Sequence, residues 1–280
     1  PIEGRSFHQP RYFGPLRFES GDMRIVISAL HFVWQDIEEC FDRLGGELGL
    51  DGVELSWHTS FARPHCTRED MEAVRRLGPA SGFELSAHIW ENPARLGPGP
   101  AEEALRSWLG HCAPAGVSAL VIHGGSYDDR REGVARTRRI LENVLPEFEA
   151  AGVTLLLENH YAYDYRDCRE LFSETWEFEE VFSLDSPALG FCLDTGHAHM
   201  TANMPELVER LAPRLRYVHL ADNDGRDDLH WMFERGTVPF RELFAQLHAA
   251  GFDGTFCVEF PVRDDLAPFR ECVAQIRELW

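Results

Sequence analysis

The sequence predicts an α/β protein that folds as a single-domain (β/α)8 TIM barrel. Eight short apolar segments recur along the chain at fairly even spacing, and helix-like stretches separate them. Several of these segments are nearly continuous in Val, Ile, Leu and Phe, a pattern typical of parallel strands buried on both faces. The length of 280 residues agrees with the usual size of this fold, about 250 residues.

The apolar segments predict strands over 23–30, 52–57, 83–89, 119–124, 154–160, 189–195, 215–221 and 254–260. Apolar residues three or four positions apart predict helices over 35–48, 67–77, 101–115, 131–151, 169–184, 204–211, 239–250 and 264–279. Glycine, which commonly ends a helix, precedes the next strand at Gly82, Gly116, Gly152 and Gly251. Residues 93–100 are expected to form a loop. An open doubly wound sheet is the alternative, but the G-x-G-x-x-G turn it usually carries does not follow the first strand.

The composition narrows the function classes. The net charge of −20 comes from 47 acidic and 27 basic residues and argues against nucleic acid or an anionic membrane as a partner. All 27 basic residues are arginine, and the chain contains no lysine. Schiff-base chemistry and a Walker A phosphate loop both need a lysine, so both are excluded.

The expected location is the cytoplasm. A membrane span needs about 20 consecutive apolar residues, and the apolar runs here are far shorter. The chain does not open with a signal-peptide pattern, and its seven scattered cysteines form no C-x-x-C pair, as in proteins with reduced thiols. Residues 1–5 contain Ile-Glu-Gly-Arg, which we interpret as the remnant of an engineered protease site, so that the single domain covers residues 6–280.

Carboxylates and imidazoles lie at the carboxyl ends of all eight expected strands, where barrel enzymes place their chemistry. They are His31, Glu54, His88, His123, Glu158, Asp194, His219 and Glu259. Any one of them alone would suit an ordinary hydrogen-bonded strand end. Together they place several like charges at one end of the barrel. This costs folding free energy unless a positive charge neutralises them. Because lysine is absent, a bound divalent cation is the simplest solution.

Further candidate ligands follow two of the strand ends. Asp194-Thr195-Gly196-His197 places a second ligand type three residues after Asp194, and Asp228-x-His230 can present two ligands to one metal. His199 is expected to be a surface or supporting residue instead.

These motifs, taken in order, resemble the xylose isomerase-like TIM barrels, a superfamily that includes sugar isomerases, sugar epimerases and the endonuclease IV enzymes. The resemblance covers roughly residues 23–260. It is carried by Gly52-Val53-Glu54-Leu55, Glu158-Asn159, Leu193-Asp194-Thr195-Gly196-His197, His219-Leu220-Ala221-Asp222-Asn223-Asp224-Gly225 and Val258-Glu259.

The resemblance implies a metal core of Glu158, Asp194, His219 and Glu259. Its leading implication is a divalent-metal-dependent sugar isomerase or epimerase that transfers a proton α to a metal-bound carbonyl through an enediolate. Glu158 is expected to be the base and Glu259 the acid, although the two could be reversed. Substrate hydroxyls are expected at His88, His123 and His197, and apolar walls at Trp57 and Trp90. The substrate is expected to be a small carbohydrate or polyol, with an unphosphorylated one favoured.

Three alternatives stay open. An endonuclease IV-like zinc cluster on abasic DNA would use nine ligands, for which His88, His123, Glu158, Asp194, His197, His219, Asp228, His230 and Glu259 are counterparts. A sugar-acid dehydratase or decarboxylase could use the same metal site. A non-catalytic binding barrel is the third. The metal could be Zn, Mn, Co, Fe or Mg, with one ion favoured and up to three allowed, and self-association into a homo-oligomer is left open.

Overall fold

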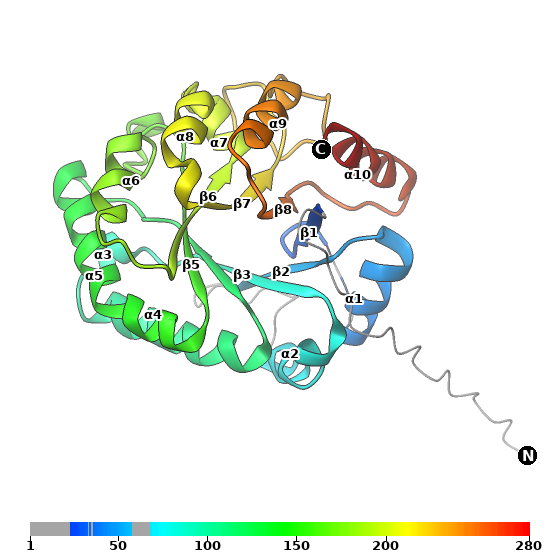
Figure 1. The fold of residues 1–280 in the computed structure, drawn as a ribbon, viewed down its shortest axis with the longest axis horizontal. Coiled ribbons are helices and arrows are strands. Elements are labelled where there is room, and N and C mark those ends of the chain that lie inside the picture. Colours follow the sequence, from blue (N-terminus) through cyan, green and yellow to red (C-terminus); the bar gives the residue numbers. More distant parts are fainter. Residues whose placement is uncertain (1–22, 33, 35, 58–67) are drawn as a thin grey trace, which may run out of the picture.

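A computed structural model describes residues 23–32, 34, 36–57 and 68–280, and it confirms the TIM barrel (Figure 1). Eight parallel strands pair in chain order and close on one another, because β1 pairs with both β2 and β8. The strands are β1 Arg24–Ser28, β2 Gly52–Trp57, β3 Glu84–Ile89, β4 Ala119–Ile122, β5 Thr154–Glu158, β6 Leu189–Asp194, β7 Leu215–Leu220 and β8 Thr255–Val258. The interpretation of residues 1–5 lies outside the described residues.

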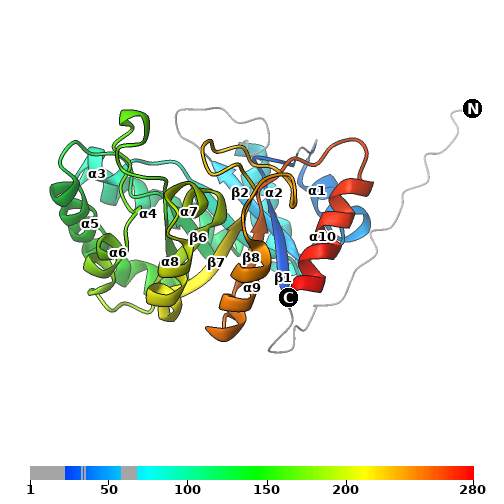
Figure 2. The same cartoon turned by 90° about the horizontal axis from the view of Figure 1, so that it is seen from above.

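Helices surround the strands on the outside (Figures 1 and 2). They are α1 Ile37–Arg43, α2 Arg68–Ser81, α3 Pro93–Leu96, α4 Pro100–Cys112, α5 Arg130–Ala151, α6 Thr175–Phe182, α7 Thr195–Thr201, α8 Met204–Leu211, α9 Phe240–Ala249 and α10 Ala267–Leu279. A π-helical turn, Leu44–Leu48, extends α1, and 3-10 turns cover Ala113–Ala115, Tyr165–Asp167 and Ala212–Arg214. The glycines expected to end helices adopt positive φ, from 68° at Gly152 to 80° at Gly116.

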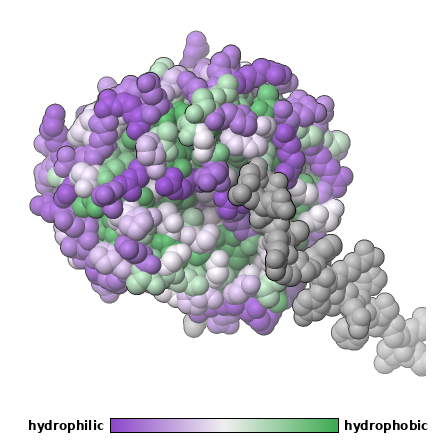
Figure 3. All heavy atoms as spheres, viewed as in Figure 1, coloured by the Kyte–Doolittle hydropathy of each residue, from purple (hydrophilic) through white to green (hydrophobic). Residues whose placement is uncertain are grey.

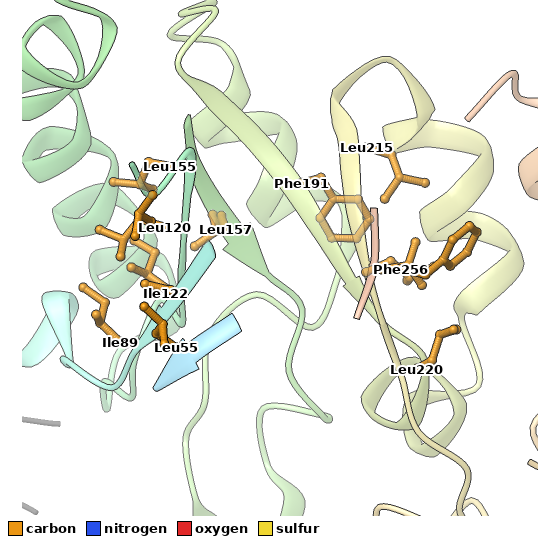
Figure 4. Packing of buried hydrophobic residues seen from close by; sticks show 14 of the residues in the cluster. Leu55, Ile89, Leu120, Ile122, Leu155, Leu157, Phe191, Leu215, Leu220 and Phe256 are labelled. Atoms are coloured by element: carbon orange, nitrogen blue, oxygen red, sulfur yellow. The ribbon is translucent and has the colours of Figure 1, made fainter. Parts of the chain in front are cut away.

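Alternating strand residues face opposite sides of the barrel wall. The outward residues form one large core with the helices, to which Leu55, Ile89, Leu120, Leu155 and Phe191 belong (Figure 4). A second, separate cluster of buried residues belongs to the barrel interior and is called the lower layer below. It consists of Val26, Val121, Leu156, Cys192, Tyr217 and Cys257. This layer closes the barrel beneath the strand ends.

The observed helices differ from the prediction in three places. The helix expected over 169–184 is limited to α6, because Arg169 and Phe172 adopt positive φ of 59° and 67° and the chain bends before the helix starts. A short helix, α3, occupies part of the loop expected over 93–100, with Asn92 capping it by accepting the N–H of Arg95. The third, α7, was not predicted at all; Asp194 caps it by accepting the N–H of His197.

The surface has few exposed apolar side chains. Leu96, 44% exposed, is the one large hydrophobic residue exposed among those described, and Figure 3 shows hydrophilic side chains over much of one face. Within the described part of the chain, no helix is both long and apolar enough to cross a membrane. The six described cysteines are all free thiols.

Candidate metal centre

The carboxyl ends of the strands bring the predicted site residues together in one place. Glu158 ends β5, Asp194 ends β6, His219 lies in β7 and Glu259 directly follows β8. Each of these side chains comes two residues after a member of the lower layer, so each faces the barrel interior as that member does. All four are at most 3% exposed. The roles predicted for them stay predictions.

His219 is the centre of the carboxylate group. Its Nδ1 lies 3.1 Å from Glu158 Oε1, 3.6 Å from Glu259 Oε2 and 4.0 Å from Asp194 Oδ2. One ring nitrogen therefore faces three carboxylates that come from three different strand ends. Carboxylate oxygen and imidazole nitrogen are the ligand types that divalent transition metals take.

A second group joins the first through Glu158. Its Oε2 lies 3.2 Å from His88 Nε2 and 3.1 Å from His123 Nε2, and these two imidazole nitrogens are 3.2 Å apart. The ligand atoms of the three residues are close enough to surround one ion. Glu158 thus contacts both this pair of histidines and His219.

A third group lies toward the loop between β7 and α9. His197, on α7, lies 3.4 Å from Asp194 Oδ1 through Nδ1 and 3.5 Å from Asp228 Oδ2 through Nε2. His230 Nε2 reaches Asp228 Oδ1 at 3.3 Å. The structure therefore brings the Asp228-x-His230 pair to the same site as the strand-end residues.

Neighbouring loops hold these side chains in place. The side chain of Asn159 accepts the N–H of Asp194 at 2.8 Å and donates to the Asp194 carbonyl at 3.0 Å, so β5 and β6 are tied together at the site. Tyr165 donates its hydroxyl to Asp227 Oδ1 at 2.9 Å, and Arg166 forms an ion pair with the same carboxylate. The β5–α6 loop is thereby attached next to Asp228.

The donor set fits a divalent cation. Among the described residues, three groups of His, Asp and Glu have ligand atoms within 4.8 Å of one another: Glu54, His88, His219 and Glu259; His88, His123 and Glu158; and Glu158, Asp194 and His197. Glu54 Oε1 and Glu259 Oε1 are buried there without a hydrogen-bond partner in the described structure. An unpaired buried carboxylate oxygen is costly, and a cation would satisfy it.

The two glutamates have opposite pKa shifts. Burial opposes ionisation of Glu158, but the charges of His219, His123 and His88 outweigh it and hold the pKa of Glu158 well below its ordinary value. Burial raises the pKa of Glu259 to about 7, because His219 and His230 offset it only in part. At neutral pH Glu158 is therefore ionised, whereas Glu259 is partly protonated.

The histidines show how negative this site is. Burial disfavours the charged form of His88, but Glu158 and Glu54 outweigh it and raise the pKa of His88 to about 10. Asp228 and Glu259 likewise overcome burial and raise the pKa of His230 to about 9. Protons on the imidazoles thus supply positive charge of the kind that a divalent ion would bring.

Sequence reasoning gave no role to three residues that the structure places at the site. Glu54 contacts His219 and His88, His31 lies 3.2 Å from His230 between ring nitrogens, and His160 stacks on His197 at 4.4 Å between ring centroids. Glu54 and His31 were already visible in the sequence as polar residues at strand ends. His160 lies two positions after Glu158 and gave no separate signal.

Of the two predicted tryptophans, the structure describes the side chain of Trp90 but not that of Trp57. Trp90 stacks on His88 at 5.2 Å between ring centroids and donates its indole N–H to Ser56 Oγ at 3.3 Å, so it lies beside the site. Only the backbone of Trp57 is described, and its predicted side-chain role lies outside the described residues. His199 Nε2 lies 2.8 Å from Thr237 Oγ1, which agrees with the supporting role expected for it.

Comparison with known proteins places this site in context. The family model described as "Xylose isomerase-like TIM barrel" matches residues 43–279. A fructoselysine 3-epimerase of Escherichia coli O157:H7 is 35% identical over 258 residues, which cover 80% of this chain and 85% of the relative. A probable endonuclease 4 of Mycobacterium leprae is 26% identical over 189 residues, 61% of this chain and 70% of the relative.

Solved structures share the fold. A D-tagatose 3-epimerase-like protein superposes with a TM-score of 0.75 at 21% identity, and covers 92% of this chain and 98% of its own. A D-psicose 3-epimerase with D-tagatose, from Clostridium cellulolyticum H10, superposes with a TM-score of 0.69 at 17% identity and 86% coverage of both chains. At these identities the likeness is one of fold.

Proposed function

Because the chain belongs to the xylose isomerase-like TIM barrel family, we propose that it is a divalent-metal-dependent sugar epimerase or isomerase. The observation that carries the proposal is the pair Glu158 and Glu259, which approach one nitrogen of His219 from strands that are not neighbours. Two glutamates so placed can serve the two sides of a substrate carbon that loses and regains a proton.

The pKa shifts support a division of roles. The lowered pKa of Glu158 keeps this carboxylate ionised at neutral pH, which is the state a base needs to remove the proton α to the substrate carbonyl. Burial raises the pKa of Glu259 in the absence of a metal, and this group would be the acid that returns a proton to the neighbouring carbon or to the opposite face.

Glu158, Asp194, His219 and Glu259 would hold the metal. When bound, the ion would supply Lewis-acid polarisation of the substrate carbonyl. His88, His123 and His197 would bind substrate hydroxyls, since each has a polar ring nitrogen directed toward Glu158. Trp90 would close one side of the pocket and limit access of water.

The proposed substrate is a ketose or a ketose derivative. The fructoselysine 3-epimerase and the D-psicose 3-epimerase are both named for 3-epimerisation of such a compound. Proton exchange next to a carbonyl is also the chemistry that the two glutamates can perform. The dehydratase and decarboxylase hypotheses begin with a related step, and analysis of the product distinguishes these reactions from epimerisation.

The test starts with elemental analysis of protein purified without chelator. We expect about one divalent ion per chain and, on incubation with a panel of ketoses in D2O, deuterium incorporation at the carbon next to the carbonyl. Failure to bind Zn, Mn, Co, Fe or Mg after soaking would overturn the proposal. So would metal-loaded protein that leaves the α-hydrogen of every ketose in the panel unexchanged.

A zinc-cluster phosphodiesterase is the second candidate. It is favoured by Asp228, which contacts both His197 and His230 and so brings two further predicted zinc ligands beside the strand-end residues. The charge of −20 weighs against a DNA substrate. Two or three zinc ions per chain together with cleavage of an abasic DNA duplex would favour this candidate, and intact DNA with one ion per chain would oppose it.

A further inference from the structure

We propose that Glu54 is a positioning residue whose two carboxylate oxygens fix which ring nitrogen of His219 faces the metal and which ring nitrogen of His88 faces Glu158. The inference rests on the metal site of the proposed function. Glu54 lies in β2 and is fully buried. Its carboxylate belongs to one candidate ligand group, but the proposed function gives it no role as metal ligand, base or acid.

The contact with His219 is a hydrogen bond. Glu54 Oε2 lies 2.9 Å from His219 Nε2, while the opposite nitrogen, Nδ1, faces Glu158, Asp194 and Glu259. An ionised carboxylate can only accept a hydrogen bond, so this contact keeps a proton on Nε2. The lone pair of the neutral ring is then on Nδ1, which is the nitrogen that faces the three carboxylates.

The contact with His88 has the same arrangement. Glu54 Oε1 lies 3.7 Å from His88 Nδ1, and His88 Nε2 faces Glu158 and His123. Both Glu54 Oε1 and His88 Nδ1 are buried without a hydrogen-bond partner among the described residues. A movement of about 0.5 Å would bring this pair to hydrogen-bonding distance and satisfy both atoms.

The neighbouring strands leave space for this carboxylate. Glu54 lies in register with Ser28 of β1 and Ser86 of β3, and both are small, buried residues. His88 and His219 come from β3 and β7, and both belong with Glu54 to one candidate metal group, while His88 also belongs to the group with His123 and Glu158. A single carboxylate therefore contacts imidazoles from two strands that are not neighbours, and fixes how the two rings lie relative to one another.

The experiment compares wild type with Glu54→Gln, using zinc alone as the probe. An amide has one acceptor oxygen where the carboxylate has two, so it cannot accept from both imidazoles. We expect zinc affinity, measured by competition with a chromophoric chelator, to fall about 10- to 100-fold. The zinc content at saturation should be unchanged. Glu84→Gln, a glutamate at the opposite end of the barrel wall, is the matched control and should bind zinc as wild type does.

The spectroscopic readout is the imidazole tautomer. Long-range 1H–15N correlation spectra of the zinc-loaded wild type should show His219 protonated at Nε2 and His88 protonated at Nδ1. In Glu54→Gln at least one of the two should lose this preference. If Glu54→Gln does not fold, the wild-type spectra and Glu54→Asp, which keeps the charge but shortens its reach, carry the test.

Each result is decisive. Equal zinc affinity and unchanged tautomers in Glu54→Gln would overturn the inference while leaving the proposed metal site standing. Zinc bound to His219 through Nε2 would also overturn it, because Glu54 would then be a ligand itself. A wild type that binds no zinc and no other divalent metal would overturn the proposed function and the inference together.

Discussion

Two levels of the same barrel interior differ completely in chemistry. The lower layer contains Leu156, Cys192, Tyr217 and Cys257, and carries no charge at neutral pH. Two residues further along the same strands, on the same face and about 7 Å away, the interior carries Glu158, Asp194, His219 and Glu259. The same strand pairing connects the two levels, as between Cys192 and Tyr217 below and Asp194 and His219 above.

The difference shows how the barrel separates stability from function. The lower layer excludes water and packs against itself, as the interior of a TIM barrel usually does. The level above concentrates acids and histidines in a buried space, which costs folding free energy unless a cation is present. Substitutions at the two levels should therefore change different measured quantities.

The largest effect is expected for Glu158→Gln at the upper level. The amide cannot act as the base and is a weaker metal ligand, so kcat for ketose epimerisation should fall about 10,000-fold. Discontinuous epimerisation assays, combined with measurement of isotope exchange, would determine this change in kcat. Glu84→Gln is the matched control, because Glu84 begins β3 at the opposite end and pairs with Arg24 at 3.0 Å. Comparable loss in that control would contradict the division between the two levels.

The next effect is expected for Leu156→Ala in the lower layer. Removing a fully packed side chain should lower the free energy of unfolding by about 2–5 kcal/mol, measured by urea titration of metal-loaded protein. The kcat of the folded variant should stay close to that of wild type. Leu96→Ala, at an exposed position, should leave the unfolding curve nearly unchanged. A large fall in kcat with unaltered stability would reverse our interpretation of the lower layer.

A smaller effect is expected from pH in chelator-treated protein. The pKa of Glu259 is about 7 in the folded chain against an ordinary 4.5, so between these values the folded state holds a proton that the unfolded state has lost. The contribution of Glu259 to stability is therefore full below about pH 4.5 and falls as pH rises to 7.

Glu259→Gln removes this dependence. The variant should gain stability relative to wild type as pH rises from 5 to 8, and thermal unfolding at both pH values would measure the gain. Added zinc should abolish the advantage, because the cation stabilises the ionised carboxylate of the wild type. An advantage that stays constant across this pH range would contradict the assignment of the raised pKa to Glu259.

The smallest effect is expected for Trp90→Phe, at the edge of the upper level. The phenyl ring keeps the aromatic contact with His88 but loses the hydrogen bond to Ser56. We expect KM for the ketose to rise about 2- to 10-fold with little change in kcat. A fall in kcat at unchanged KM would show that Trp90 acts on the reacting groups rather than on binding.

Much of the fold could be predicted because its signals are local. Apolar runs located all eight strands, and the glycines that end helices are read from single positions. The bend before α6 was missed because positive φ at non-glycine residues such as Arg169 leaves no compositional signal. The helix α7 was missed because Asp194 was interpreted only as a ligand, although its carboxylate also caps the helix.

The site could be predicted in part for the same reason. The strand ends identified Glu158 and Glu259 as neighbours in space, because all parallel strands of a barrel finish at one face. The contacts of Glu54 could not be predicted, since they depend on the directions in which side chains of β2, β3 and β7 extend into the barrel. The opposite pKa shifts of the two glutamates also depend on which histidines each one touches.

The position of Asp228 and His230 on a loop has a consequence for how barrels of this family diverge and can be redesigned. The four core residues belong to or directly follow strands, whereas this pair lies on a segment joined to the rest of the site by contacts such as those of Tyr165 and Arg166 with Asp227. Exchanging that one segment would alter this outer pair of proposed ligands and leave the strand register untouched. A chimaera that swaps only the β7–α9 connection is therefore the economical starting point for changing how many ions, and which reaction, this scaffold supports.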